Sequence, residues 1–426
     1  MMLNTYLTFQ RVILLIHYLI YPLSLVLSPV FTFVKKRRQF ETALAVSSFK
    51  GSGRHASHCF HVSSEGELEQ ALPLIQYFLD QGNLIELVYT SDSVSRKCDL
   101  LSKQYENLNV LRMPLLSFPR ISFRRWVTAK KLFMCRYDFF SELMLYGSRK
   151  DVEFTLLSAS LKGKRLSGFK KVFTRDLYRC FDYIIAASEV EKENFLNLSS
   201  DYNVTAFEFR LLQIASRLDA SEDKFLEKDS LYNFFEILKS RDVKTNLIIG
   251  SSWEVELNIF KDQRLVEKIR AGELLVVIAP HSLSKESLLS LTKVFNELAP
   301  SLSLVNANDV REYREGEVYL NSTPGVLLES YSLFGHVLVG GGHGRSIHSV
   351  LEPYLAGSRV YCGPKVFRST EFDFIKKESP NDVVVIENLE EISSSIADYN
   401  RELELEKRSS LINLYKSRFT EIMERF

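Results

Sequence analysis

Short apolar runs alternate with longer amphipathic segments along most of the chain after about residue 50. The runs are apolar throughout rather than at every second position, which indicates strands that are buried on both faces. Strands separated by helical segments predict parallel α/β sheets. The expected strands of a first series are 59–63, 84–90, 109–113, 132–136, 154–158 and 183–187. Those of a second series are 246–250, 274–279, 302–305, 318–321, 337–340, 359–362 and 383–387.

The two series predict two doubly wound domains. Residues 216–244 lie between them, are rich in charge and poor in strand formers, and are expected to be a linker. The predicted organisation is an N-terminal segment at 1–40, a first domain at 41–215, the linker, a second domain at 245–400 and a C-terminal helix at 401–426. Ligands of such sheets bind at the carboxyl ends of the strands, so function is expected in the loops that follow strands, around a cleft between the domains.

The N-terminal segment differs from the rest of the chain. Residues 12–34 contain no Asp, Glu, Lys or Arg, and this run of 23 exceeds the ~18–20 residues that span a bilayer core. Four basic residues follow at 35–38, so the C-terminal side is expected to stay in the cytoplasm. Pro22 and Pro29 interrupt the run. The sequence predicts a membrane anchor, preferably a kinked span, and leaves an interfacial hairpin as the alternative.

Composition excludes several classes of protein. The chain of 426 residues is 46% hydrophobic and 25% charged, as in an ordinary globular protein rather than a disordered or multi-span membrane chain. Its 54 Lys and Arg residues balance 53 Asp and Glu residues, whereas nucleic-acid-binding proteins have a basic excess. The five cysteines are far apart and form no zinc-binding or disulfide pattern, so buried thiols and no metal site are expected.

The loop after the first expected strand is one candidate site. Ser64 is suited to cap the next helix, Gly66 permits close approach of another group, and Glu67 lies in the first helical turn. Glu67 can complement the helix dipole or act as a catalytic carboxylate, and both interpretations remain open.

Two loops of the second series are further candidates. Ser251 and Ser252 follow a strand at a place where hydroxyl groups and backbone amides can hold a phosphate, although an ordinary helix cap has the same residues. His281 also follows a strand, and a single histidine there is either a structural hydrogen-bonding residue or part of a site.

The glycine-rich loop at 340–345 is the strongest candidate. It reads GGGHGR after an apolar strand and is expected to open a helix, an arrangement in which backbone amides approach an anion. It matches neither the dinucleotide fingerprint nor the P-loop, and a tight turn without a ligand is the alternative. Arg345 adds a charge that suits phosphate or carboxylate. Glu352, expected about two turns into the helix, can accept bonds from sugar hydroxyls or face solvent.

In this order the loops resemble the motifs of the Kdo transferases, which add 3-deoxy-D-manno-octulosonic acid (Kdo) to lipid A precursors. The resemblance extends over nearly the whole chain. The similar segments are H-x-x-S-x-G-E at 61–67, G-S-T-[HW] at 250–253, A-P-H at 279–281, and G-G-x-G-x-x-I-H-x-x-L-E at 341–352 with G-P at 363–364. Weaker similarities lie at 136–139, 158–160 and 181–189.

The resemblance implies a GT-B fold, with two Rossmann-like domains, an active site in the cleft between them and a membrane anchor helix. It implies transfer of Kdo from CMP-Kdo to a lipid A precursor (lipid IVA) with inversion, without a metal or other cofactor, at the cytoplasmic face of the inner membrane. Glu67 would be the general base. The implied donor-binding residues are Ser251, Ser252, His281, Gly341, Gly342, Gly344, Arg345, His348 and Glu352. Implied supporting residues are His61, Ser64, Gly66, Asp138 and Arg210.

Three segments depart from the family pattern. Phe139-Phe140-Ser141 lacks the family's Trp-Pro, residues 207–210 replace a Gly-Asp-Thr-Arg/Lys stretch, and Ser322 stands in place of an Asp. These departures leave two alternatives to a lipid A-specific enzyme. One is a GT-B glycosyltransferase with another donor or acceptor, and the other is a catalytically silent, membrane-tethered scaffold of envelope assembly.

Overall fold

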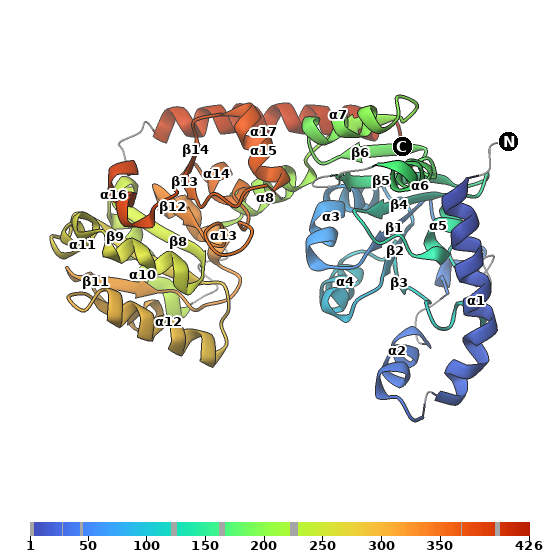
Figure 1. Ribbon diagram of the computed structural model, residues 1–426, viewed down its shortest axis with the longest axis horizontal. Helices are drawn as coiled ribbons and strands as arrows, with labels where there is room; N and C mark the ends of the chain where they lie inside the picture. The colour runs from blue at the N-terminus through green and yellow to red at the C-terminus, as the bar shows by residue number, and fades with distance from the viewer. Residues whose placement is uncertain are drawn as a thin grey trace. The chain divides into compact units, whose positions relative to one another are not determined.

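The chain forms two compact units, Met1–Arg210 and Leu211–Phe426, in a computed structural model (Figure 1). The described residues are 4–27, 29–42, 46–120, 126–161, 167–221, 229–367, 369–396 and 401–426. Each unit contains a seven-stranded sheet in which all neighbouring strands run parallel. The predicted α/β class with two parallel sheets is therefore confirmed.

The N-terminal unit has the strand order β3-β2-β1-β4-β5-β6-β7. Its strands are β1 (His58–Val62), β2 (Ile85–Tyr89), β3 (Leu108–Arg112), β4 (Lys131–Cys135), β5 (Glu153–Ala159), β6 (Tyr183–Ala186) and β7 (Val204–Ala206). Its helices are α1 (Thr5–Leu27), α2 (Thr32–Thr42), α3 (Glu65–Asp80), α4 (Asp92–Gln104), α5 (Ser141–Gly147), α6 (Gly168–Tyr178) and α7 (Glu189–Leu198). Figure 1 shows α3 and α4 on one side of this sheet and α1 and α5 on the other.

One strand of this sheet, β7, is not indicated by the apolar pattern of the sequence. β7 has only three residues, two of them partly exposed, so it lacks the continuous apolar run of the other strands. The remaining six strands lie where the apolar runs predict them, because each run is almost entirely buried between helices. All five cysteines are buried and free, as expected.

The C-terminal unit has the strand order β10-β11-β9-β8-β12-β13-β14. Its strands are β8 (Asn246–Ser252), β9 (Leu275–Pro280), β10 (Ser303–Asn306), β11 (Glu317–Leu320), β12 (His336–Val339), β13 (Arg359–Cys362) and β14 (Val383–Val385). Its helices include α10 (Tyr232–Ser240), α11 (Gln263–Arg270), α12 (Lys285–Leu298), α13 (Leu327–Ser330), α14 (Leu351–Leu355), α15 (Thr370–Glu378), α16 (Ile392–Ser395) and α17 (Arg401–Met423). The helix α8 (Phe209–Asp219) lies at the boundary of the two units.

Two local predictions in this unit are wrong. The glycine-rich loop does not open a helix, because residues 341–350 are irregular and α14 begins only at Leu351. Glu352 consequently lies in the first turn of a five-residue helix rather than two turns into a long one. The sequence pattern predicts a helix here, but the glycines form turns instead. Hydrogen bonds from the amides of Gly344 and Arg345 to the carbonyl of Gly341 hold these turns.

Candidate functional site

The predicted site residues gather at the point in each sheet where the strand order reverses direction. In the N-terminal unit this point lies between β1 and β4, and in the C-terminal unit between β8 and β12. Open α/β sheets bind ligands there, because the loops diverge to opposite faces and leave a crevice at the strand ends. The loops that follow these four strands are the ones in which the sequence analysis placed most of its candidates.

The loop after β1 is fixed by a reciprocal pair of hydrogen bonds. Ser64 caps α3 by accepting a bond from the amide of Glu67 at 3.3 Å, and Glu67 Oε2 accepts one from the amide of Ser63 at 2.6 Å. The first bond satisfies an amide that the helix leaves unpaired, and the second holds the carboxylate at the helix start. A Cβ on Gly66 would meet no atom within 4 Å, so the fold itself does not require glycine there.

Glu67 has the electrostatic properties of a general base. Burial raises the pKa of its carboxyl group to about 7, and the charge of Asp138 raises it further while Arg136 and the bonded amides oppose the shift. A carboxylate with a pKa near the working pH is partly ionised and still binds a proton well. Glu67 is therefore well suited to take a proton at neutral pH.

Asp138 and Arg136, which follow β4, complete this side of the site. Burial raises the pKa of Asp138 as well, and its Oδ2 atom is buried with no hydrogen-bond partner among the described residues. Arg136 has a φ of +58°, which a non-glycine residue adopts only at an energetic cost, and it donates to Gln70 Oε1 at 3.0 Å. Arg136 thus lies where its charge acts on Glu67. Arg136 was only a weak similarity in the sequence.

His61 and Arg210 are two more of the implied supporting residues. His61 is on β1 rather than in the loop, is buried, and lies 2.7 Å through Nε2 from Thr90 Oγ1. Burial lowers the pKa of His61 to about 3, so the ring is neutral and holds the strand end in place. Arg210 donates its amide to the carboxylate of Glu208, and the charges of Arg210 and Arg136 oppose the burial that raises the pKa of Glu208. Arg210 therefore lies in the same charged cluster as Arg136.

In the C-terminal unit, three aromatic rings from three loops form a stack. The His281 ring lies 4.4 Å from the Trp253 ring and 4.3 Å from the His348 ring, centroid to centroid and nearly parallel. Trp253 Nε1 donates a hydrogen bond to His348 Nε2 at 3.3 Å. His348 is therefore neutral with its proton on Nδ1, consistent with a pKa lowered to about 4 by burial and by the nearby His281 and Arg345.

Arg345 covers the same stack. Its guanidinium lies 4.1 Å from the centroid of the Trp253 ring, a cation–π contact that holds the charge over the aromatic surface. Arg345 and His281 are both exposed. The structure thus brings Arg345, His281 and His348 together, and Trp253 contacts all three.

The glycine-rich loop makes close backbone contacts. A Cβ on Gly341 would lie 2.4 Å from the Ser346 carbonyl oxygen, and one on Gly342 would lie 2.6 Å from the amide nitrogen of Gly363. Gly344 has only an ordinary contact, at 3.7 Å from Val255. Hydrogen bonds inside the protein occupy the amides of Gly341, Gly344 and Arg345, so not all of the loop amides are available to a ligand.

The amides of Gly342 and His343 differ from the others in this loop, since no hydrogen bond among the described residues engages them. Ser251, at the facing strand end, has a φ of +53°, a strained conformation that turns the chain sharply at the end of β8. Ser252 donates its hydroxyl to the carbonyl of Trp253 at 3.1 Å, and its own carbonyl accepts the amide of His281 at 2.9 Å. Ser252 therefore ties the second and third loops together.

Glu256 is a site residue that the sequence pattern does not indicate. Its buried carboxylate accepts the amide of Trp253 at 2.8 Å and the amide of Gly341 at 3.0 Å, so it connects the loops after β8 and β12. Burial raises its pKa, and the two bonded amides oppose the shift. A glutamate three residues into a helical turn looks like an ordinary cap in the sequence, so only the long-range bond to Gly341 distinguishes it.

Glu352 lies near the end of β8. Burial raises the pKa of Tyr331, and the charge of Glu352 adds to this shift. The phenol oxygen of Tyr331 would lie 2.3 Å from a Cβ on Gly250 in β8. Gly250 directly precedes Ser251. Among the described residues, no group of three or more His, Cys, Asp or Glu side chains is arranged to hold a metal ion.

Comparisons with solved structures show the fold. UDP-GlcNAc 2-epimerase from Neisseria meningitidis superposes with a TM-score of 0.57 and 13% identity, covering 82% of this chain and 93% of that one. A glycosyltransferase from Rickettsia africae has a TM-score of 0.55 and 10% identity, covering 87% and 98%. The C-terminal CMP-Kdo binding domain of WaaA from Acinetobacter baumannii has a TM-score of 0.34 and 17% identity, covering 44% and 96%. Among curated proteins no relative matches.

A family model matches the N-terminal unit. It describes the 3-deoxy-D-manno-octulosonic-acid transferases, and the match extends over residues 34–208, which include most of α2, all of β1 and Glu67. The first motif of the resemblance, at 61–67, thus lies inside a segment recognised independently as this family. Residues 34–208 of the chain therefore match the Kdo transferase family model.

Proposed function

We propose that this protein is a Kdo transferase that moves Kdo from CMP-Kdo to a lipid A precursor. The observation on which the proposal rests is the Glu67 carboxylate, which lies at the start of α3 in the matched segment with a pKa of about 7. The C-terminal motifs at 250–253, 279–281 and 341–352 support CMP-Kdo as the donor. The departures at 139–141, 207–210 and 322 make the acceptor the less constrained partner.

In the proposed reaction, Glu67 takes the proton of an acceptor hydroxyl as its oxygen attacks the anomeric carbon of Kdo. The bond from that carbon to the phosphate oxygen breaks, the electron pair leaves with CMP, and the configuration inverts. Asp138 and Arg136 adjust the proton affinity of Glu67 from opposite directions. In this proposal an arginine and backbone amides, rather than a metal, stabilise the leaving phosphate.

On the donor side, Arg345 would neutralise the phosphate, together with the amides of Gly342 and His343 and the hydroxyls of Ser251 and Ser252. His281 lies between Trp253 and His348 in the aromatic stack and is exposed, and it would contact the phosphate or the Kdo carboxylate. Glu352 would accept bonds from the ribose hydroxyls. Gly341 and His348 would act by shaping the loop, because their close packing and hydrogen bonds hold it in place.

The test is direct. Full-length protein in lipid vesicles is incubated with CMP-Kdo and tetraacylated lipid IVA, and the products are weighed by mass spectrometry. We expect a mass increase of one or more Kdo units. No product from a folded protein that still binds CMP would point to another acceptor. Absence of both product and CMP binding would remove the proposed donor and favour the scaffold alternative.

The rate is expected to depend on pH with a midpoint near 7. Glu67 must be ionised to accept a proton, so kcat/KM should rise as the pH increases through the pKa of Glu67 and level off above it. His281 and His348, whose pKa values are lowered, complete their titration at lower pH. Initial rates between pH 5.5 and 8.5 measure this. A profile without this rise would contradict the assignment of the base.

A further inference from the structure

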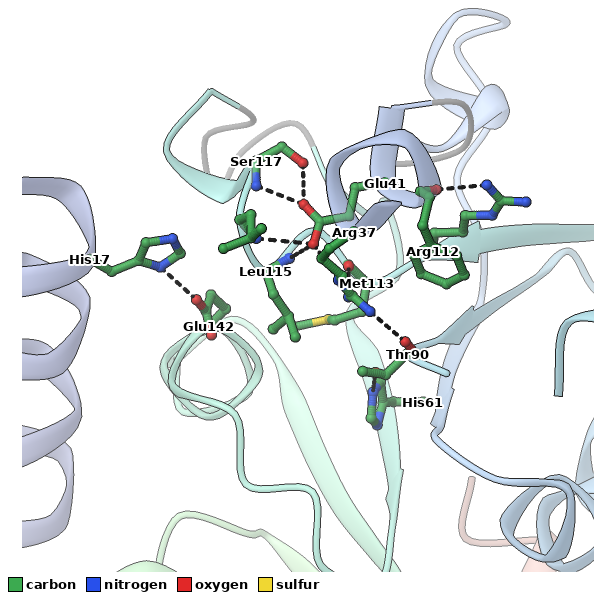
Figure 2. A network of polar contacts seen from close by, with 12 residues as sticks. His17, Arg37, Glu41, His61, Thr90, Arg112, Met113, Leu115, Ser117 and Glu142 are labelled. Atoms are coloured by element: carbon green, nitrogen blue, oxygen red, sulfur yellow. Dashed lines mark hydrogen bonds and ion pairs between the residues drawn. The ribbon is translucent and has the colours of Figure 1, made fainter. Parts of the chain in front are cut away.

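The apolar N-terminal run is attached to the N-terminal unit at its beginning. One face of α1 packs against α5 and α6, and Tyr6, Gln10 and Leu14 on that face are buried. Polar side chains reinforce this contact at intervals along the helix, and Figure 2 shows one of them. The bonds join the amide of Thr5 to Asp176 Oδ2 at 2.9 Å, Ser141 Oγ to Gln10 Oε1 at 2.5 Å, and His17 Nδ1 to Glu142 Oε1 at 3.0 Å.

The end of the run is attached to the same unit through α2. Arg37 donates through Nη1 to the Thr90 carbonyl at 2.7 Å, through Nη2 to the Met113 carbonyl at 2.8 Å, and through Nε to Glu41 at 2.7 Å (Figure 2). These carbonyls lie just beyond β2 and β3. One arginine of the basic cluster at 35–38 therefore fastens α2 to the unit.

Glu41 strengthens this second attachment. Its fully buried carboxylate accepts the amides of Leu115, Leu116 and Ser117 at 3.0, 3.0 and 2.7 Å, as well as the Ser117 hydroxyl (Figure 2). A buried carboxylate with several donors and an arginine partner is costly to disrupt, because separation would leave charges and amides unpaired. The attachment of α2 is thus built into the unit rather than a loose contact.

The two attachments determine the path of the chain between them. A single membrane span would place residues before and after it on opposite sides of the bilayer. Here residues 4–17 and 37–41 contact the same unit, so the intervening chain leaves and returns on one side. Residues 29–30 form a turn that contains Pro29, and α2 runs from there back to the unit. In Figure 1 the C-terminal half of α1 continues past the sheet toward this turn.

The projecting part exposes apolar side chains. Leu19 is 72% exposed, Val30 73% and Phe33 79%, and more apolar side chains around them are exposed as well. The others between residues 18 and 33 are Tyr18, Ile20, Leu23, Leu25, Val26 and Phe31. A continuous apolar surface of this kind is rare on soluble monomers and marks a binding surface.

The basic residues of the N-terminal segment and the length of its projecting helix indicate what the exposed apolar surface binds. Residues 4–42 contain five basic residues and one acidic residue, Glu41, and Arg11, Lys35 and Lys36 are exposed. Basic residues beside an apolar surface attract anionic headgroups. The segment 18–27 is helical and measures ~15 Å at the rise of an α-helix, about half of the ~30 Å hydrocarbon core.

We propose that residues 18–34 form a monotopic hairpin that inserts into one leaflet of an anionic bilayer, with both of its ends on the side of the N-terminal unit. This proposal favours the interfacial hairpin over the membrane span. Binding by this hairpin does not depend on which sugar the enzyme transfers.

Labelling of single introduced cysteines tests the topology. Thr8→Cys and Lys36→Cys are exposed and flank the hairpin, while the native thiols are buried and give little background. Full-length variants are added to preformed vesicles of phosphatidylcholine and phosphatidylglycerol with an impermeant maleimide outside or trapped inside. We expect both cysteines to react only with the outside reagent. Reaction of Thr8→Cys with the trapped reagent alone would establish a span and overturn the hairpin.

Vesicle flotation tests whether the exposed apolar residues of the hairpin bind the bilayer. Leu23→Asp and Val30→Asp should each weaken vesicle binding by about tenfold or more, because a carboxylate replaces an inserted apolar group. Leu289→Asp is the matched control, since Leu289 on α12 is also 72% exposed but lies outside the hairpin. We expect wild-type binding from the control. Equal binding by all three variants, or no binding of the wild type to protein-free vesicles, would overturn the proposal.

Discussion

Glu67→Gln is expected to lower kcat/KM for sugar transfer by about 10²–10⁴-fold, the usual contribution of a positioned general base. Glutamine keeps the shape of the side chain and an oxygen that can accept the Ser63 amide, so the start of α3 should remain intact. What it loses is the capacity to take a proton. Single-turnover rates with the product measured by mass spectrometry give the size of the effect, and CMP binding by calorimetry should be unchanged.

Glu65→Gln is the matched control for this experiment. Glu65 lies in the same first turn, but it is exposed and pairs with Lys97 at 2.7 Å on the surface. Exposed pairs of this kind contribute little, so transfer should stay within about twofold of wild type. If Glu67→Gln and Glu65→Gln had equal, near-normal rates, Glu67 would not be the base. A large loss in both would indicate that the helix start, and not the base, is sensitive.

Glu256→Ala is expected to have the largest effect on the C-terminal unit. It removes the carboxylate that accepts the amides of Trp253 and Gly341 and leaves both without their partner. Leaving a buried amide unsatisfied costs about 1–3 kcal/mol, so the free energy of unfolding should fall by about 2–4 kcal/mol. The loops after β8 and β12 would then be free to separate, and CMP binding should be lost. Chemical denaturation and calorimetry measure the two effects.

Two companion variants make this result interpretable. Glu256→Gln keeps one acceptor oxygen and should be intermediate in both stability and CMP binding. Glu254→Ala removes a half-exposed carboxylate two residues earlier in the same helical turn and should change the unfolding free energy by less than about 0.5 kcal/mol. Normal CMP binding by Glu256→Ala would show that the glycine-rich loop holds its shape without this link.

Local patterns predicted some residues well because their properties are local. The apolar runs predicted nearly every strand, since a strand buried on both faces must be apolar at every position. Ser64 and Glu67 could be placed at a helix start because capping depends on residues three apart in the chain. A local helical pattern gave the wrong prediction at 341–350. Hydrogen bonds to Gly341 and packing against Gly363 impose turns on this segment.

The sequence alone determined the parallel α/β class, the apolar N-terminal run and the order of the candidate loops. These follow from composition and from spacing within one element. Only the tertiary structure decided that Trp253, His281 and His348 stack, that Glu256 connects two loops, and that Arg37 and His17 fasten both ends of the apolar run to one unit. Such contacts join residues from dozens to more than a hundred positions apart. Their partners are set by strand order and packing, which no local pattern encodes.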